Sequence, residues 1–222
     1  MFLSPMTRYK ALYFRSWLTR WLASWLLLIS AGIALPALAQ TSSYSETQLI
    51  QRAEQAIREI KTLKANFLQI SSDGSVGEGI LYLRRPTQLR LEYTKPETLT
   101  LVTSRVWLYV DDKVAKSVQA IPLGQTPLSL LLSKEVSFRS EDFKTSAEEQ
   151  DGIAVISMVK QDGDAAGQLD LEFDTDSWQL RRWVITDLLG VETIVTLQNP
   201  VYGQVLANKL FGVPSYPQNS GN

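Results

Sequence analysis

Residues 77–96 read Gly-Glu-Gly-Ile-Leu-Tyr-Leu-Arg-Arg-Pro-Thr-Gln-Leu-Arg-Leu-Glu-Tyr-Thr-Lys-Pro. This stretch contains two runs in which apolar and polar side chains alternate, as they do in β-strands with one buried face. Pro86 lies between the two runs. Because proline has no backbone N–H to donate to a ladder, we expect Pro86 at a turn or at a sheet edge. The stretch therefore predicts two strands on either side of such a point.

The alternation also assigns side chains to faces. In the second run, one face carries Leu89, Leu91 and Tyr93. In the first run, Leu81, Leu83 and Arg85 share a face, so that Arg85 closes an apolar row. One interpretation is that the arginine stem covers hydrophobic surface while its head stays in water. The other is that Arg85 lies at the rim of an apolar cavity and donates its N–H groups to carbonyl oxygens there.

Residues 1–39 have the pattern of a secretory signal peptide. A basic region without acidic residues precedes an apolar run at 21–35, and Ala37-Leu38-Ala39 has the small side chains of a cleavage site. A retained membrane anchor is the alternative, but the apolar run is shorter than the ~20 residues that a spanning helix needs. We therefore expect a cleaved signal peptide at 1–39, a single domain at 40–213 and a flexible tail at 214–222.

The composition narrows the function further. The chain has 22 basic and 23 acidic residues, and with four basic residues in the predicted signal peptide the remainder has a net charge of −5. This acidic balance argues against binding nucleic acid or anionic lipid. The chain has no cysteine and no histidine. It therefore lacks disulfides, His-dependent nucleophiles and the usual zinc and copper ligands.

Helical and strand patterns follow one another along the chain. Ser45 and Gln48 fit a capping box, and apolar residues then recur at helical spacing to about Leu63. Short strands separated by turns are expected at 65–70, 79–83, 89–93, 99–103, 106–110, 114–119, 153–159, 169–173, 180–185 and 192–197. Such a series is typical of an antiparallel sheet that curls into a barrel or half-barrel.

A second helix is expected after Pro127. Thr126 would cap it, Pro127 would occupy its first position, and four leucines fall within residues 128–132. A helix this apolar belongs either to a buried core or to a cavity wall.

Three motifs suggest chemistry but are better explained otherwise. Gly77-x-Gly79 leads into a strand, whereas phosphate loops lead into a helix. Glu78 and Glu92 could form a glycosidase pair, but Arg90 shares a face with Glu92 and favours ion pairing. The Asp-rich turns lack the glycine and glutamate that a calcium loop needs. We therefore expect no catalytic residues, metal or cofactor.

Several segments together resemble the periplasmic outer-membrane lipoprotein carriers of the LolA family. They are residues 65–69, 79–86, 90–93 with Pro96, 101–102, 107–109, the leucines after Pro127, and 180–183 with Asp187 and Gly190. Their order and spacing, more than any single piece, carry the resemblance, which covers essentially the whole chain after the predicted signal peptide.

The resemblance implies an α+β fold in which a curled antiparallel sheet forms an incomplete β-barrel with helices as a lid over an apolar cavity. It also implies a non-enzymatic chaperone that binds lipoprotein acyl chains and carries lipoproteins from the inner to the outer membrane. The implied partners are acylated lipoproteins, an inner-membrane ABC-type extractor and an outer-membrane receptor. We expect a periplasmic monomer. The alternative is a periplasmic lipid- or lipoprotein-sensing regulator with the same half-barrel, but such regulators usually carry a second C-terminal domain.

The resemblance also assigns site residues. In the family, the arginine directly before the proline of the Arg-Pro pair bonds the lid in its closed state, and here that residue is Arg85. Apolar residues on the same face and on the second helix are the cavity candidates: Leu81, Leu83, Leu91, Tyr93, Leu128, Leu130, Leu131 and Leu132.

Overall fold

The computed structural model describes residues 44–141, 143–160 and 166–216. The predicted signal peptide lies outside the described residues, as does the predicted tail beyond residue 216. No helix in these ranges is long and apolar enough to cross a membrane.

Helix α1 spans Glu46–Glu59 and begins with the predicted capping box. Gln48 N donates to Ser45 Oγ over 3.4 Å, and Ser45 N donates to Gln48 Oε1 over 2.9 Å. Both bonds satisfy N–H groups that a helix start otherwise leaves unpaired. One face of the helix is buried, through Leu49, Ile50, Ala53 and Ile57.

The predicted extension of α1 to Leu63 is wrong. Ile60 is already extended (φ −65°, ψ 110°). The first strand begins at Thr62, which pairs with Arg84. The apolar spacing of residues 57, 60 and 63 fits a helix, but it fits equally a helix end followed by a strand.

Eleven strands form one antiparallel sheet. They are β1 (Thr62–Ser71), β2 (Val76–Arg84), β3 (Gln88–Lys95), β4 (Leu99–Ser104), β5 (Trp107–Asp112), β6 (Ser117–Pro122), β7 (Lys144–Gln150), β8 (Ile153–Lys160), β9 (Gly167–Asp174), β10 (Leu180–Thr186) and β11 (Glu192–Tyr202). The spatial order is β6-β5-β4-β3-β2-β1-β11-β10-β9-β8-β7.

Two of these strands differ from the prediction. β6 starts later than the expected 114–119, because Asp112 Oδ1 accepts bonds from Val114 N and Ala115 N, each 2.9 Å long, and holds those residues in the turn. β7 was not predicted. It contains no large apolar residue, so its sequence lacks the hydrophobic alternation by which strands are recognised.

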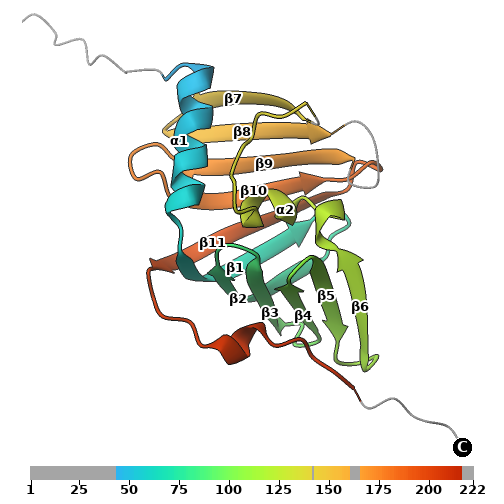
Figure 1. The fold of residues 1–222 in the computed structure, drawn as a ribbon. Coiled ribbons are helices and arrows are strands. Elements are labelled where there is room, and N and C mark those ends of the chain that lie inside the picture. Colours follow the sequence, from blue (N-terminus) through green and yellow to red (C-terminus); the bar gives the residue numbers. More distant parts are fainter. Residues whose placement is uncertain (1–43, 142, 161–165, 217–222) are drawn as a thin grey trace, which may run out of the picture. The chain divides into compact units, whose positions relative to one another are not determined.

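The helices lie over one face of this sheet, which we call the inner face. Figure 1 shows α1 crossing β7–β10, and the short α2 (Leu128–Leu132) over the middle strands. β6 and β7 do not pair in the described part of the chain, so the barrel stays open. The predicted fold class, an α+β half-barrel with a helical lid, is confirmed.

The start of α2 differs from the prediction in detail. Pro127 occupies the N-cap position, and no side chain caps the helix. The Thr126 hydroxyl instead donates to Leu123 O over 2.8 Å, within a 3₁₀ turn at Leu123–Gln125. The predicted Thr126 cap is therefore wrong.

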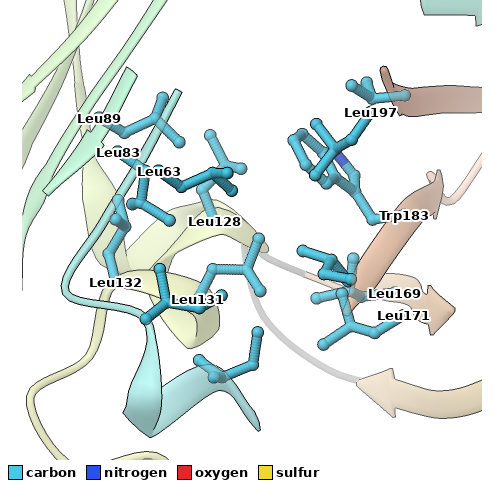
Figure 2. Packing of buried hydrophobic residues seen from close by; sticks show 14 of the residues in the cluster. Leu63, Leu83, Leu89, Leu128, Leu131, Leu132, Leu169, Leu171, Trp183 and Leu197 are labelled. Atoms are coloured by element: carbon cyan, nitrogen blue, oxygen red, sulfur yellow. The ribbon is translucent and has the colours of Figure 1, made fainter. Parts of the chain in front are cut away.

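The core fills the space between the helices and the inner face. Figure 2 shows the α2 leucines beside Leu63, Leu83 and Leu89, with Leu169, Leu171 and Trp183 across from them. In the same cluster, Phe67 and Tyr93 form an edge-to-face pair with ring centroids 5.0 Å apart. Gly77 and Gly79 face the same side and leave room for these two rings.

A second 3₁₀ turn, Asn208–Phe211, lies against the opposite face. The Arg84 guanidinium lies 4.7 Å from the Phe211 ring centre and donates to Leu206 O over 3.1 Å. Arg84 and Arg85, which follow one another at the end of β2, thus make their contacts on opposite faces of the sheet.

Candidate functional site

Arg85 lies in the turn between β2 and β3, beneath the C-terminal end of α2. Its Nη1 donates to Leu131 O, and its Nη2 donates to Ser133 O over 2.7 Å. In the same turn, Thr87 N donates to Leu132 O over 3.1 Å. The last carbonyls of a helix have no partner within it. The turn therefore supplies partners for three consecutive carbonyls at the end of the lid helix.

The turn itself is fixed from below by a buried hydroxyl. Thr103 on β4 is fully buried; its Oγ1 donates to Thr87 O and accepts from Leu89 N, each over 2.7 Å. Arg85 N also donates to Lys61 O over 2.9 Å, which joins the turn to the segment after α1. Arg85 is therefore held in place before it meets the lid.

We expect Thr103→Val to lower the free energy of unfolding by about 2 kcal/mol, because the buried Leu89 N–H would lose its acceptor. Thr100→Val on the same strand is the matched control. The Thr100 hydroxyl is buried without a hydrogen-bond partner in the described ranges, so valine there should be neutral or stabilising. Urea denaturation of both variants measures the difference. Equal stabilities would contradict a structural role for the Thr103 bonds.

Arg85 carries a partly buried charge. Burial lowers the pKa of the Arg85 guanidinium. The group nevertheless stays protonated, because arginine does not lose its proton in proteins. No acidic side chain of the described residues forms an ion pair with it. Among the described residues, the partly desolvated charge is thus compensated by carbonyl dipoles, which belong to a separate element of the fold.

The interior beneath α2 is closed. The space there measures about 10 Å³, which holds one water molecule at most. Arg85 lines it together with apolar residues from both halves of the sheet and from the helices: Ile57, Ile60, Leu63, Leu81, Leu83, Leu89, Leu131, Leu180 and Trp183. An acyl chain could enter this interior only if the lid moved away.

The structure brings most predicted cavity residues together. Leu81, Leu83 and Leu131 line the closed interior, and the same buried cluster includes Leu91, Tyr93, Leu128 and Leu132. Leu130 is only partly buried and lines a separate space of about 30 Å³ beside β8 and β9. That these residues form an acyl-binding cavity, with Arg85 as its lock, stays a prediction.

Burial raises the pKa of Tyr93 to about 12. Its hydroxyl donates to Gln69 Oε1 over 2.6 Å. This polar pair lies at the far end of the apolar row, away from α2, and keeps the tyrosine proton in place at any physiological pH.

A second set of lid contacts could not be seen in the sequence. The segment after α2 runs along α1, where Phe138 N donates to Glu54 Oε1 over 2.8 Å. Arg58 Nη1 donates to Val136 O over 2.9 Å. On α1 these charged residues look like a solvent-exposed face; in fact they join α1 to the segment that follows α2.

The two glutamates considered for catalysis are ion-paired on the face opposite the helices. Glu78 Oε2 lies 3.1 Å from Lys95 Nζ, and Glu92 Oε2 lies 3.0 Å from Arg90 Nε. The ion-pair interpretation is therefore confirmed.

Comparison with known proteins identifies the family. The model of the family described as outer membrane lipoprotein carrier protein LolA matches residues 58–214. An outer-membrane lipoprotein carrier protein of Methylococcus capsulatus is 30% identical over 194 residues, which cover 81% of this chain and 90% of the relative. One from Pseudomonas fluorescens is 27% identical, covering 79% and 87%.

Among solved structures, a LolA superfamily protein from Nitrosomonas europaea matches 77% of this chain and 99% of its own, with a TM-score of 0.45 and 9% identity. At that level of similarity, the assignment rests on the sequence matches. The family model covers most of the chain, and it includes Arg85 and the carbonyls at the end of α2 that Arg85 bonds. The chain belongs to the LolA family of outer membrane lipoprotein carrier proteins.

Proposed function

We propose that this protein is a periplasmic carrier that shields the acyl chains of lipoproteins and moves lipoproteins from the inner to the outer membrane. Membership of the LolA family supports this role. The observation that carries the proposal is the Arg85 contact, in which a helix that covers a continuous apolar interior is bonded through its last backbone carbonyls and not through an ion pair. Displacing such a helix does not break a buried ion pair.

The energetics suit a carrier that uses no bound energy source. Hydrogen bonds to a charged group contribute about 1.5–3 kcal/mol each. An acyl chain entering the interior would replace the lid leucines with equivalent apolar surface, so little apolar area meets water during the exchange. The cost of opening is therefore mainly that of the hydrogen bonds to the lid, among them the two from Arg85. No catalytic step is needed.

In this proposal, residues 40–213 act as one carrier domain after removal of residues 1–39. The protein receives cargo from an ABC-type extractor in the inner membrane and delivers it to a receptor in the outer membrane. It acts as a monomer, because one interior accommodates one cargo.

Native mass spectrometry tests the proposal directly. The protein is purified from periplasm without detergent, from cells that produce a lipoprotein cargo. We expect a one-to-one complex with the acylated lipoprotein. The matched control is the same cargo with its acylated cysteine replaced by serine, which should give no complex. Only unloaded protein in both samples would contradict the carrier role and favour a sensing role.

A further inference from the structure

A second pocket lies at the C-terminal end of α1, outside the lid contact. It has a volume of about 420 Å³, which is within the usual range for small-molecule sites. Ala56 and Ile60 come from the end of α1, Trp178 and Leu180 from the turn into β10, and Tyr202 from the end of β11. Arg85 does not line it. The pocket is therefore open while the lid is closed.

This pocket and the closed interior share part of their walls. Ile60 and Leu180 line both spaces. Each is buried, with 7% and 3% of its surface exposed. Two apolar residues are therefore shared by the solvent-accessible pocket and the space beneath α2.

Trp178 is held at this pocket in a strained conformation. Its φ of 55° lies in the left-handed region, which bulky residues avoid. The turn maintains it, since Trp178 N donates to Asp174 O over 2.7 Å, and Ser177 N donates to Asp174 Oδ1 over 2.8 Å. The indole packs edge-on against the Tyr44 ring at 5.6 Å. Strained residues of this kind gather at ligand sites.

Tyr202 adds an unsatisfied donor. Its hydroxyl oxygen is buried and has no hydrogen-bond partner among the residues that the structure describes. Burial also raises the pKa of Tyr202, so the hydroxyl keeps its proton. Because this oxygen is shielded from solvent, it does not bond a ligand in the open pocket, and Tyr202 contributes other atoms to the wall.

The charges at the pocket disfavour a free anion. Glu59 and Lys61 both line it, carry opposite signs and are exposed. Thr62, Ser177 and Gln179 also line the pocket. Its apolar residues, Ile60 and Leu180 among them, lie on the side next to the closed interior, and an acyl chain is the part of the cargo that they would accept.

We propose that this pocket is a first docking site for one acyl chain of the cargo. The chain occupies it while the lid is closed, and passes Ile60 and Leu180 when the lid opens. The inference rests on the carrier function proposed above and adds an entry site to it.

Tryptophan quenching distinguishes the two spaces, because Trp178 lines the outer pocket and Trp183 lines the closed interior. Two variants each keep one of these tryptophans, with every other tryptophan replaced by phenylalanine. The probe is the uncharged methyl ester of dibromostearate, at a concentration below that at which it aggregates, since bromine quenches indole on contact. With Arg85 present, we expect quenching of Trp178 and none of Trp183. With Arg85→Leu added, both should be quenched.

Point variants then identify the contacts. Ala56→Phe should fill the pocket and abolish quenching of Trp178, whereas Gln51→Phe, at an exposed position of the same helix, should leave it unchanged. Tyr202→Phe should leave both probe binding and the melting temperature unchanged, because the hydroxyl is shielded from the pocket and has no partner among the described residues.

The outcomes separate this inference from the carrier function. Quenching of Trp183 but not Trp178 would overturn the docking site and leave the carrier role intact. Quenching of Trp178 that survives Ala56→Phe would also overturn the site. If neither tryptophan were quenched, even with Arg85→Leu, acyl binding itself would be contradicted, and both proposals would fail.

Discussion

Arg85→Leu is expected to leave the protein folded while slowing the handover of bound lipoprotein by roughly 10- to 100-fold. The wild-type closed state is stabilised by two bonds from a charged guanidinium to Leu131 O and Ser133 O. Cargo must break them, so their free energy is subtracted from the affinity for cargo. Without them the open, loaded state is favoured, and cargo dissociates more slowly.

The measurement is the rate at which labelled lipoprotein passes from preloaded carrier to outer-membrane vesicles. Arg84→Leu is the matched control, since it removes the same charge one residue earlier. On the opposite face, Arg84 Nη1 donates to Leu206 O and to Asn208 Oδ1 over 3.1 and 2.9 Å. Its loss should leave the transfer rate unchanged. If Arg85→Leu transferred at the wild-type rate, or both variants slowed equally, the lid-lock role of Arg85 would be wrong.

Gly79→Ala is expected to lower the free energy of unfolding by about 3 kcal/mol or more, enough to prevent folding of a marginally stable domain. A Cβ at this position would lie 2.2 Å from Glu92 O and 2.6 Å from two atoms of the Phe67 ring. The oxygen belongs to the neighbouring strand, and the ring is fixed against Tyr93. Neither can withdraw without disturbing the ladder between β2 and β3.

Gly124→Ala provides the control for that substitution. A Cβ at Gly124 would meet no atom within 4 Å, so its effect should stay within about 0.5 kcal/mol. Urea denaturation of both variants gives the comparison. Similar midpoints would show that the approach of Phe67 to β2 is less constrained than its distances suggest.

Local patterns in the sequence predicted local structure well. The alternation around Pro86 assigned the faces of β2 and β3, and the Ser45 capping box depends on residues three apart. The same rules failed at Thr126, because a hydroxyl can bond back into the preceding turn as easily as it can cap the next helix. They also failed for β7, an edge strand with little apolar surface.

Long-range contacts explain most of what the sequence did not reveal at the site. It placed Arg85 at the end of an apolar row, but its acceptors are backbone carbonyls 46 and 48 residues further along. Backbone carbonyls leave no signature in the side-chain pattern. The outer pocket was missed for the same reason, since Trp178 and Tyr202 lie far along the chain from Ala56 and Ile60, which line the same pocket. A tryptophan inside the Asp-rich turn at 174–178 was the one available hint.

The open barrel has a consequence for solubility. Among the described strands the sheet does not close, so β6 and β7 are its two edges. Free edges can pair with other chains and start aggregation. β7 counters this with an exposed row of polar side chains that includes Lys144 and Glu148, and β6 ends at Pro122. A closed barrel would remove the hazard, but it could not widen around a guest. The charged side chains on β7 therefore oppose aggregation at an edge that the open sheet leaves free.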